Sequence, residues 1–264
     1  MNTGKLMRLA FLTFLPSLAF PQQWQPKQAK LMTKYARNIS PKNVLPEYPR
    51  PQMVRSKWLS LNGLWEYQPG TSAQETLPKG KLASSILVPF AVESALSGVM
   101  EQHDRLWYSR KFIVPASWKG EKILLHFGAV DYESEVYING KSLGIHKGGY
   151  DPFSFDITSA LTKTGEQEIA VRVFDPTDNG GQPRGKQTLH PQGIMYTSTT
   201  GIWQTVWLEP VPKTNIENIK IVPDIDRSVV KLMVNSANAA GYQVNIKVKD
   251  GGSIIQSITG KPNT

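Results

Sequence analysis

The chain has 264 residues, of which 40% are hydrophobic, enough for one or two domains with a sizeable core. It contains no cysteine, which excludes disulfide frameworks, thiolate metal sites and cysteine nucleophiles. The net charge is +9, but the first 60 residues contain ten basic residues and one acid, so the rest of the chain is neutral overall. A nucleic-acid-binding face needs clustered basic residues in the folded part, and the sequence after residue 60 shows no such cluster.

The N-terminus has the pattern of a secretory signal peptide. Lys5 and Arg8 precede a mostly apolar run that ends near Phe20, with small residues before it at Ser17 and Ala19. We therefore expect residues 1–20 to be removed and the protein to be secreted or periplasmic. The run is too short to span a bilayer, and no later stretch is longer and as apolar, so no membrane span is expected. Residues 21–48 are polar, basic and rich in proline, which predicts a lead-in segment that either lies over the surface or is a flexible tail.

From residue 50 onward the pattern is that of an all-β protein. Short runs of alternating apolar and polar residues are separated by Gly, Pro, Asn and Asp, and no amphipathic helix is evident. Strands are predicted over residues 111–114, 122–127, 135–138, 168–174 and 204–208, and residues 106–112 also alternate as a strand does. Asn139-Gly140 predicts a hairpin turn, because both central residues of a type I′ turn need positive φ. The spacing favours a β-sandwich or jelly roll over residues 49–212.

Four more short strands are predicted after Pro212, over residues 216–222, 229–234, 242–248 and 253–258. An immunoglobulin-like sandwich has seven strands in about 100 residues. Residues 213–264 therefore predict a partial, truncated immunoglobulin-like domain.

The aromatic residues divide into two groups. The first group lies in or beside predicted strands, where packing in the core or at its edge is the expected role, and consists of Trp107, Trp118, Trp203 and Trp207. Tyr150 and Tyr196 lie in turn-rich segments and are the better candidates for exposed rings that stack on a sugar.

Sequence motifs for phosphate binding, metal binding or catalysis are nearly absent. Residues 180–186 approach a phosphate-binding loop, but Gln187 stands where Ser or Thr is required and no apolar helix follows. The four histidines have neither metalloprotease nor serine-hydrolase spacing, so no metal site and no cofactor are predicted. Asp131, Glu133 and Glu135 alternate along one predicted strand. Neighbours on one strand face cannot flank a glycosidic bond from two sides, so these three carboxylates are predicted to lie on a solvated sheet face.

A longer set of segments carries a family resemblance, in the same order along the chain as in the family. The segments are Leu61–Tyr67, Val88-Pro89, Leu106–Phe112, Leu125–Asp131, Val136–Gly140, Gly148–Tyr150, Phe153–Thr158, Val171–Thr177 and Thr200–Glu209. Over residues 61–211 the chain resembles the N-terminal sugar-binding jelly roll of glycoside hydrolase family 2, which includes β-galactosidases, β-glucuronidases and β-mannosidases. The resemblance implies that an immunoglobulin-like domain follows and that the catalytic glutamates belong to a TIM barrel, which the 52 residues after Pro212 are too few to form.

The resemblance also implies a sugar contact. Loops of the family's jelly roll reach toward the barrel and help to shape the site around the non-reducing sugar of a β-glycoside. The long loop after Phe174 is the predicted contact, and its predicted sugar-binding residues are Asp175, Asp178, Arg184, Lys186 and Tyr196. Carboxylates accept hydrogen bonds from hydroxyls, and Arg184 or Lys186 would suit a sugar that bears a carboxylate. The sugar itself stays open, because galactosidase-like and glucuronidase-like members place Asn and an acid where this chain has Phe90-Ala91-Val92 and Met195.

These observations predict a non-catalytic, sugar-binding region of a family 2 glycoside hydrolase, inactive by itself because no catalytic residue is predicted in it. Two other functions stay open. The chain is alternatively a free-standing secreted carbohydrate-binding module, or a structural subunit that docks to a separately encoded catalytic barrel. Glycan binding by the isolated chain would favour the module, and stable pairing with a barrel chain would favour the subunit.

The signal-peptide pattern gives a first test. Protein purified from the source cells is expected to begin near Phe20 and to be found outside the cytoplasm. N-terminal sequencing measures this directly. An intact Met1 in a cytosolic fraction would show that the apolar run has another role.

Overall fold

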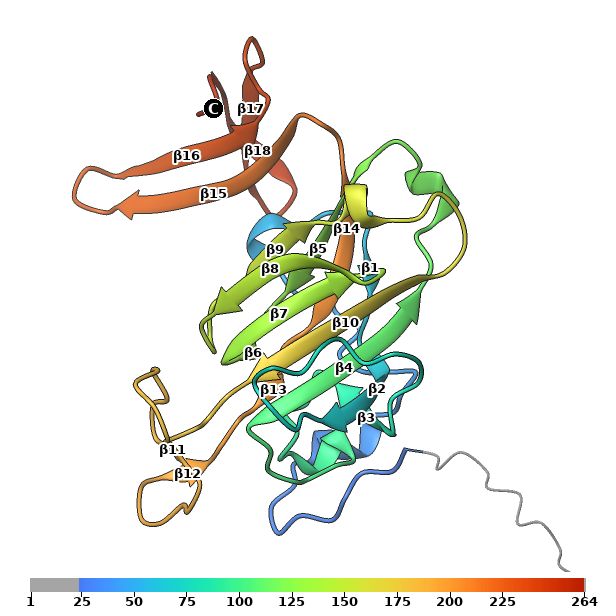
Figure 1. Ribbon diagram of the computed structural model, residues 1–264. Helices are drawn as coiled ribbons and strands as arrows, with labels where there is room; N and C mark the ends of the chain where they lie inside the picture. The colour runs from blue at the N-terminus through green and yellow to red at the C-terminus, as the bar shows by residue number, and fades with distance from the viewer. Residues whose placement is uncertain (1–23, 264) are drawn as a thin grey trace, which may run out of the picture.

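The structure is a computed structural model that describes residues 24–263, so the predicted signal peptide lies outside the described residues. Its centre is a jelly roll made of two facing antiparallel sheets (Figure 1). The six-stranded sheet has the order β3 (Ser84–Val88), β2 (Gly63–Pro69), β4 (Arg105–Phe112), β10 (Gln167–Phe174), β7 (Glu133–Ile138) and β8 (Lys141–Lys147). The four-stranded sheet has the order β1 (Leu59–Ser60), β14 (Val206–Val211), β5 (Lys122–Phe127) and β9 (Phe153–Asp156).

The shorter elements connect or extend these sheets. Two small pairs are β6 (Val130–Asp131) with β13 (Gly201–Ile202), and β11 (Gln187–Thr188) with β12 (Tyr196–Thr197). Helical structure in residues 24–263 consists of the 3₁₀ turns η1 (Lys34–Asn38), η2 (Pro51–Met53), η3 (Ala95–Ser97), η4 (Ala116–Trp118) and η5 (Thr158–Ala160). The prediction of an all-β protein is therefore confirmed.

The core lies between the two sheets and follows the period-two pattern of the strands. In β10, Ile169, Val171 and Val173 are buried in the core, while the residues between them face outward. The hairpin of β7 and β8 turns at Asn139 and Gly140, whose φ angles are 50° and 79°, as the sequence predicted. Trp118 is a core residue, as predicted.

Two strands have different bounds from those predicted. β4 begins at Arg105 and ends at Phe112, which matches the alternation over residues 106–112 but not the run predicted over 111–114. Trp107, on the outer face of β4, is buried by the loop between β2 and β3. β14 runs to Val211 rather than to residue 208, and all six of its residues are buried. A strand covered on both faces gives no alternating pattern.

Two hairpins follow the jelly roll, β15 (Asn215–Asp224) with β16 (Val229–Ala237), and β17 (Val244–Asp250) with β18 (Ser253–Gly260). All four strands coincide with the predicted ones, within a few residues at their ends. They bury little apolar surface, and Ile221 and Ile255 are 58% and 65% exposed. The division of the chain into domains at residues 48 and 212 stays a prediction.

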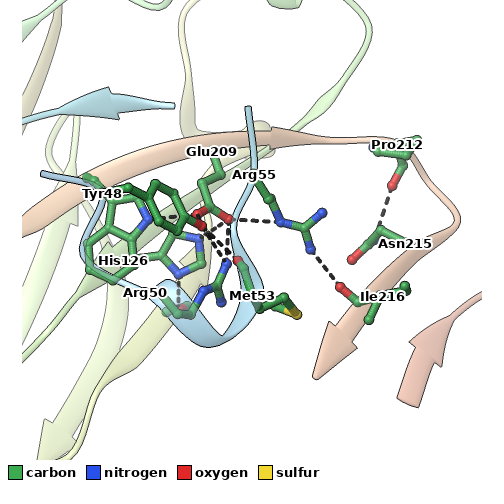
Figure 2. A network of polar contacts seen from close by, with 11 residues as sticks. Tyr48, Arg50, Met53, Arg55, His126, Glu209, Pro212, Asn215 and Ile216 are labelled. Atoms are coloured by element: carbon green, nitrogen blue, oxygen red, sulfur yellow. Dashed lines mark hydrogen bonds and ion pairs between the residues drawn. The ribbon is translucent and has the colours of Figure 1, made fainter. Parts of the chain in front are cut away.

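The lead-in segment lies along the jelly roll, one of the two arrangements left open by the sequence. At its start, Lys27 donates its backbone N–H to the carbonyl of Ala95, at 2.9 Å. At its end, Figure 2 shows Tyr48, together with Arg50 and Arg55 just after the segment, around the carboxylate of Glu209, which β14 places fully inside the protein. The segment is therefore fixed at both ends by contacts with residues far away in the sequence.

The Glu209 carboxylate has partners on both oxygens. Arg50 donates from Nη2 to Oε2 at 2.7 Å, and Trp207 donates from Nε1 to Oε1 at 2.9 Å. Tyr48 also donates to Oε1, while Arg55 Nε lies 3.0 Å and His126 Nε2 3.3 Å from Oε2, within ion-pair distance. Burial by itself would raise the pKa of Glu209, but the contacts with His126, Tyr48 and Trp207 outweigh it and lower the pKa to about 2. The group is therefore ionised at neutral pH.

Arg55 extends this cluster to the C-terminal hairpins. Its Nη2 donates to the backbone carbonyl of Ile216 in β15 at 2.6 Å, as Figure 2 shows. One guanidinium thus contacts both the last strand of the jelly roll and the first strand after it. A single buried carboxylate therefore connects the lead-in segment, the jelly roll and the first hairpin.

Replacing Glu209 by Gln is expected to reduce the free energy of unfolding by about 3 kcal/mol at pH 7, because two guanidinium groups would lose their counter-charge. The value lies at the low end for buried ion pairs because the Arg50 and Arg55 side chains are still 27% and 20% exposed. Since folding lowers this pKa, the contribution is complete above about pH 4.5 and disappears as the pH falls toward 2.

Urea unfolding at pH 7 and at pH 3 measures the loss and its pH dependence. Glu217→Gln, on the exposed side of β15, is the matched control and should leave the midpoint unchanged. Equal midpoints for Glu209→Gln and Glu217→Gln at pH 7 would contradict the role given to Glu209.

Candidate functional site

The long loop predicted to contact sugar projects from one end of the jelly roll. Residues 175–200, here called the finger, leave the end of β10 and return to β13, and Figure 1 shows them extending away from the two sheets. Within the finger, β11 and β12 form a short parallel pair in which Gln187 lies opposite Tyr196. A projecting loop with so little regular structure needs other contacts to hold its shape.

One anchor of the finger is the buried carboxylate of Asp131 at the end of β6. Gln187 donates from Nε2 to Asp131 Oδ2 at 3.0 Å and also to the hydroxyl of Tyr150 at 3.1 Å. The carbonyl oxygen of the Gln187 side chain accepts the backbone N–H of Thr199. Asp131 is only 2% exposed, so this side-chain amide joins the two arms of the finger to the jelly roll.

Two further carboxylates hold the returning arm. Glu93 accepts the backbone N–H of Thr200 at 3.0 Å and the hydroxyl of Ser198 at 3.1 Å. Asp175 accepts the hydroxyl of Thr200 at 2.9 Å and the backbone N–H of Thr177 at 2.8 Å. Each carboxylate is satisfied by uncharged donors, and together they fix where the finger begins and ends.

Burial alters the pKa values of these three anchors. Burial raises the pKa of Asp131 to about 6, against the hydrogen bond from Gln187, and the charges of Asp175 and Glu93 raise it further. Burial also raises the pKa of Glu93 and of Asp175. Ionisation of Asp131 therefore costs stability in the neutral pH range.

The predicted position of Asp131 on a solvated strand face was wrong. The chain changes direction between β6 and β7, so Asp131 faces the finger, while Glu133 and Glu135 do lie on the outer sheet face. Glu133 pairs with Lys147 at 2.8 Å, and Glu135 pairs with Arg172 at 3.1 Å. Alternation along one strand could not reveal this break between two strands.

The five predicted sugar-binding residues have different environments. Asp175 is 3% exposed and serves as an anchor, as described above. Asp178 braces the finger from inside, since it accepts the hydroxyl of Thr188 at 2.6 Å and lies 3.5 Å from Arg184 Nη1. Arg184, Lys186 and Tyr196 keep substantial exposed surface, and the backbone N–H of Tyr196 bonds to the carbonyl of Lys186 at 3.1 Å.

Exposed aromatic rings lie at the base of the finger. Tyr150 and Tyr196 are 51% and 53% exposed, as the sequence predicted for both. Their hydroxyls approach the same point, 3.5 Å and 3.7 Å from where a side chain on Gly185 would begin. Trp203, predicted to pack in the core or at its edge, is half-buried and packs edge-on against Tyr150 with ring centroids 6.0 Å apart. Tyr196 of the finger and Tyr150 of the turn before β9 thus lie close to each other at Gly185, between Arg184 and Lys186 in the sequence.

Sequence reasoning missed Glu93, Gln187 and Thr200. Their position beside matched segments was the available signal, since Glu93 follows Val88-Pro89 and Thr200 opens the last strand motif. Gln187 had been noted only as a mismatch to a phosphate-binding loop. Across residues 24–263, no group of three or more His, Asp or Glu side chains is placed to hold a metal ion. In the same range, no helix is long and apolar enough to cross a membrane.

Two facing antiparallel sheets with long connecting loops define the central part of the chain as a β-sandwich of the jelly-roll class. Comparison with protein-family models identifies the family of this domain. Residues 81–212, half of the chain, match the family model described as the sugar binding domain of glycosyl hydrolases family 2. The chain belongs to glycoside hydrolase family 2, as the sequence motifs indicated.

Similar proteins agree with this family. A β-galactosidase of Thermoanaerobacter pseudethanolicus is 35% identical over 147 residues, covering 54% of this chain and 19% of that protein. A β-glucuronidase of Paenibacillus borealis is 27% identical over 202 residues, covering 70% of this chain and 32% of that protein. The solved structure of a Faecalibacterium prausnitzii β-glucuronidase superposes with a TM-score of 0.61 and 25% identity, over 81% of this chain and 41% of that one. The chain thus spans well under half the length of these relatives.

Replacing Asp131 by Asn is expected to stabilise the protein at pH 8, by up to about 3 kcal/mol, and to have little effect at pH 4. The folded-state pKa of about 6 lies above the ordinary 3.8, so ionisation of Asp131 lowers stability as the pH rises from about 4 to 6. Asn keeps an oxygen that can accept the bond from Gln187. Thermal unfolding at both pH values measures the difference, with the exposed Asp151→Asn as control. A difference that does not change with pH would contradict the assignment.

Proposed function

We propose that the finger contacts the non-reducing sugar of a β-glycoside, and that this chain serves as the non-catalytic, sugar-binding region of a family 2 glycoside hydrolase. The observation that carries the proposal is the exposed ring of Tyr196 on a loop fixed by three buried carboxylates, with the exposed ring of Tyr150, from the turn before β9, beside it. A rigid loop loses little conformational entropy on binding, which favours recognition of a small, polar ligand. Tyrosine suits this role because its ring packs on the apolar face of a sugar while its hydroxyl bonds to hydroxyl groups.

Hydrolysis needs two carboxyl groups about 5 to 9.5 Å apart on opposite sides of the scissile bond, one of them with a raised pKa. The carboxylates with raised pKa among the described residues, Glu93, Asp131 and Asp175, are engaged in holding the finger. Glu133 and Glu135 face outward side by side, each paired with a cation. These arrangements support binding rather than bond cleavage, and we assign the catalytic pair to a barrel of the kind that family members carry.

The charge of the finger indicates which class of sugar it would bind. Arg184 and Lys186 place two cations near the exposed tyrosines, and Asp178 neutralises only Arg184. An unpaired ammonium beside a sugar site favours a ligand with a carboxylate. A β-glucuronide therefore suits the finger better than a neutral β-galactoside. Export of the protein to the periplasm or medium, where such glycosides are found, is part of the same proposal.

The purified chain is expected to hydrolyse neither β-galactoside, β-glucuronide nor β-mannoside chromogenic substrates above the rate in buffer. Sugar contacts that bind the substrate and the transition state alike do not accelerate the chemical step. Release of the chromophore measures turnover. Turnover that disappears in Glu133→Gln or Glu135→Gln would show that the outer sheet face is catalytic and would overturn the proposal.

Measurements of sugar binding test the proposed role of the finger directly. Methyl β-D-glucuronide is expected to bind the chain more tightly than methyl β-D-galactoside, and Tyr196→Ala or Lys186→Ala should weaken it about tenfold. The exposed Lys163→Ala, remote in sequence from the finger, is the charge-matched control. Equal binding by all four proteins would contradict the role of the finger.

A further inference from the structure

A groove lies on the outer face of the six-stranded sheet, away from the carboxylates that anchor the finger. Figure 1 shows the loop between β2 and β3, residues 70–83, crossing in front of β4 and β10. Between this loop and the sheet is a groove of about 240 Å³, whose polar and aromatic lining comes from Glu75, Arg105, Trp107, Glu133, Arg172 and Phe174. This volume is smaller than a typical pocket for a drug-sized ligand and corresponds to about one sugar ring.

The register of the strands places the side chains that line the groove in rows across the sheet. Phe174 in β10 lies between Arg105 of β4 and Glu133 of β7, so the three side chains form one row across the sheet. In the next row, Arg172 lies between Trp107 and Glu135. Both rows combine one aromatic side chain with two charged ones, unlike the simple polar surface expected for the outer face of a sandwich.

The guanidinium of Arg105 offers N–H hydrogen-bond donors to the groove. Its guanidinium lies 3.9 Å from the centre of the Phe174 ring, which holds the planar group in place. None of its N–H groups bonds to another residue in the described part of the chain. Arg172, by contrast, is paired with Glu135 at 3.1 Å and reaches the carbonyl of Ala73 at 3.4 Å. A guanidinium has five N–H donors, so Arg105 is fixed in orientation and still free to bind.

The opposite wall of the groove is fixed in advance. Glu75 accepts the Trp107 indole N–H at 2.9 Å, and its other oxygen accepts the backbone N–H of Thr71 at 2.9 Å. The loop is therefore fastened to the sheet by its own side chains. A preformed wall reduces the entropy that a ligand would lose on binding.

The charges of the lining identify the kind of ligand. Arg105 and Arg172 balance Glu75 and Glu133, so the groove is neutral overall but offers both donors and acceptors. A neutral sugar matches this set, because each hydroxyl both donates and accepts. We propose that this groove is a second carbohydrate site, which binds one neutral sugar unit of a glycan independently of the finger.

The test is a titration of the ¹⁵N-labelled chain with lactose, cellobiose and β-1,4-mannobiose, followed by NMR. At least one of these neutral disaccharides is expected to shift the amide signals of Arg105, Arg172 and Phe174. Arg105→Ala should weaken that binding about tenfold, and Arg105→Lys should also weaken it, because a lysine keeps the charge but loses the planar donor set. Retention of the other amide signals shows that each variant is folded.

Two matched controls separate this site from others. Lys111→Ala removes one positive charge from the outer face of the same strand but outside the groove, and Tyr196→Ala changes only the finger. Both should leave the shifts at the groove unchanged. The proposal is overturned if no disaccharide shifts these signals, if Lys111→Ala weakens binding as much as Arg105→Ala, or if methyl β-D-glucuronide binds the groove more tightly than the neutral sugars. Failure at the groove with intact binding at the finger would leave the proposed function standing.

Discussion

Glu209 places a full negative charge inside the protein, and a buried charge is tolerated only where cations and hydrogen-bond donors surround it. The sheets supply two of these partners, Trp207 and His126, while Tyr48 comes from the end of the lead-in segment and both arginines from the residues between it and β1. Residues 48–55 must therefore stay on the sheets for the carboxylate to be satisfied. Because Arg55 also bonds to β15, the same constraint extends to the first hairpin after the jelly roll.

The carboxylates that anchor the finger have the opposite shift in pKa from Glu209. Asp131, Glu93 and Asp175 are held by amides and hydroxyls without a cation, so burial raises their pKa values, whereas the contacts around Glu209 lower its pKa. One protein thus uses buried carboxylates with lowered and with raised pKa values for two structural purposes. The first fixes segments relative to one another, and the second gives a projecting loop a defined shape.

The two proposed binding surfaces are connected through one strand. At the end of β10, Phe174 faces outward into the groove, and the next residue, Asp175, turns inward and begins the finger. The sheets provide rigidity, while recognition is assigned to side chains on loops and on the outer face. This division agrees with a family in which one fold carries several sugar specificities, because loop residues can change without altering the core.

Much of the fold could be predicted from the sequence because its signals are local. Alternation within β5 and β10, the turn residues Asn139 and Gly140, and the ordered family motifs each depend on a few neighbouring residues. The same signals indicated the finger as the loop to examine, and the exposure of Tyr150 and Tyr196. The absence of cysteine and the placement of the basic residues likewise needed only the sequence.

The tertiary structure alone decided which polar side chains turn inward. Asp175 was chosen as a sugar contact and proved to be an anchor, and Glu209 gave no local signal although Tyr48 and Arg50 reach it across 161 and 159 residues of sequence. A carboxylate is polar whether it faces water or a buried donor, so composition and periodicity cannot separate the two cases. Only the packing of distant segments determines which donors it meets, and those donors determine its charge and its role.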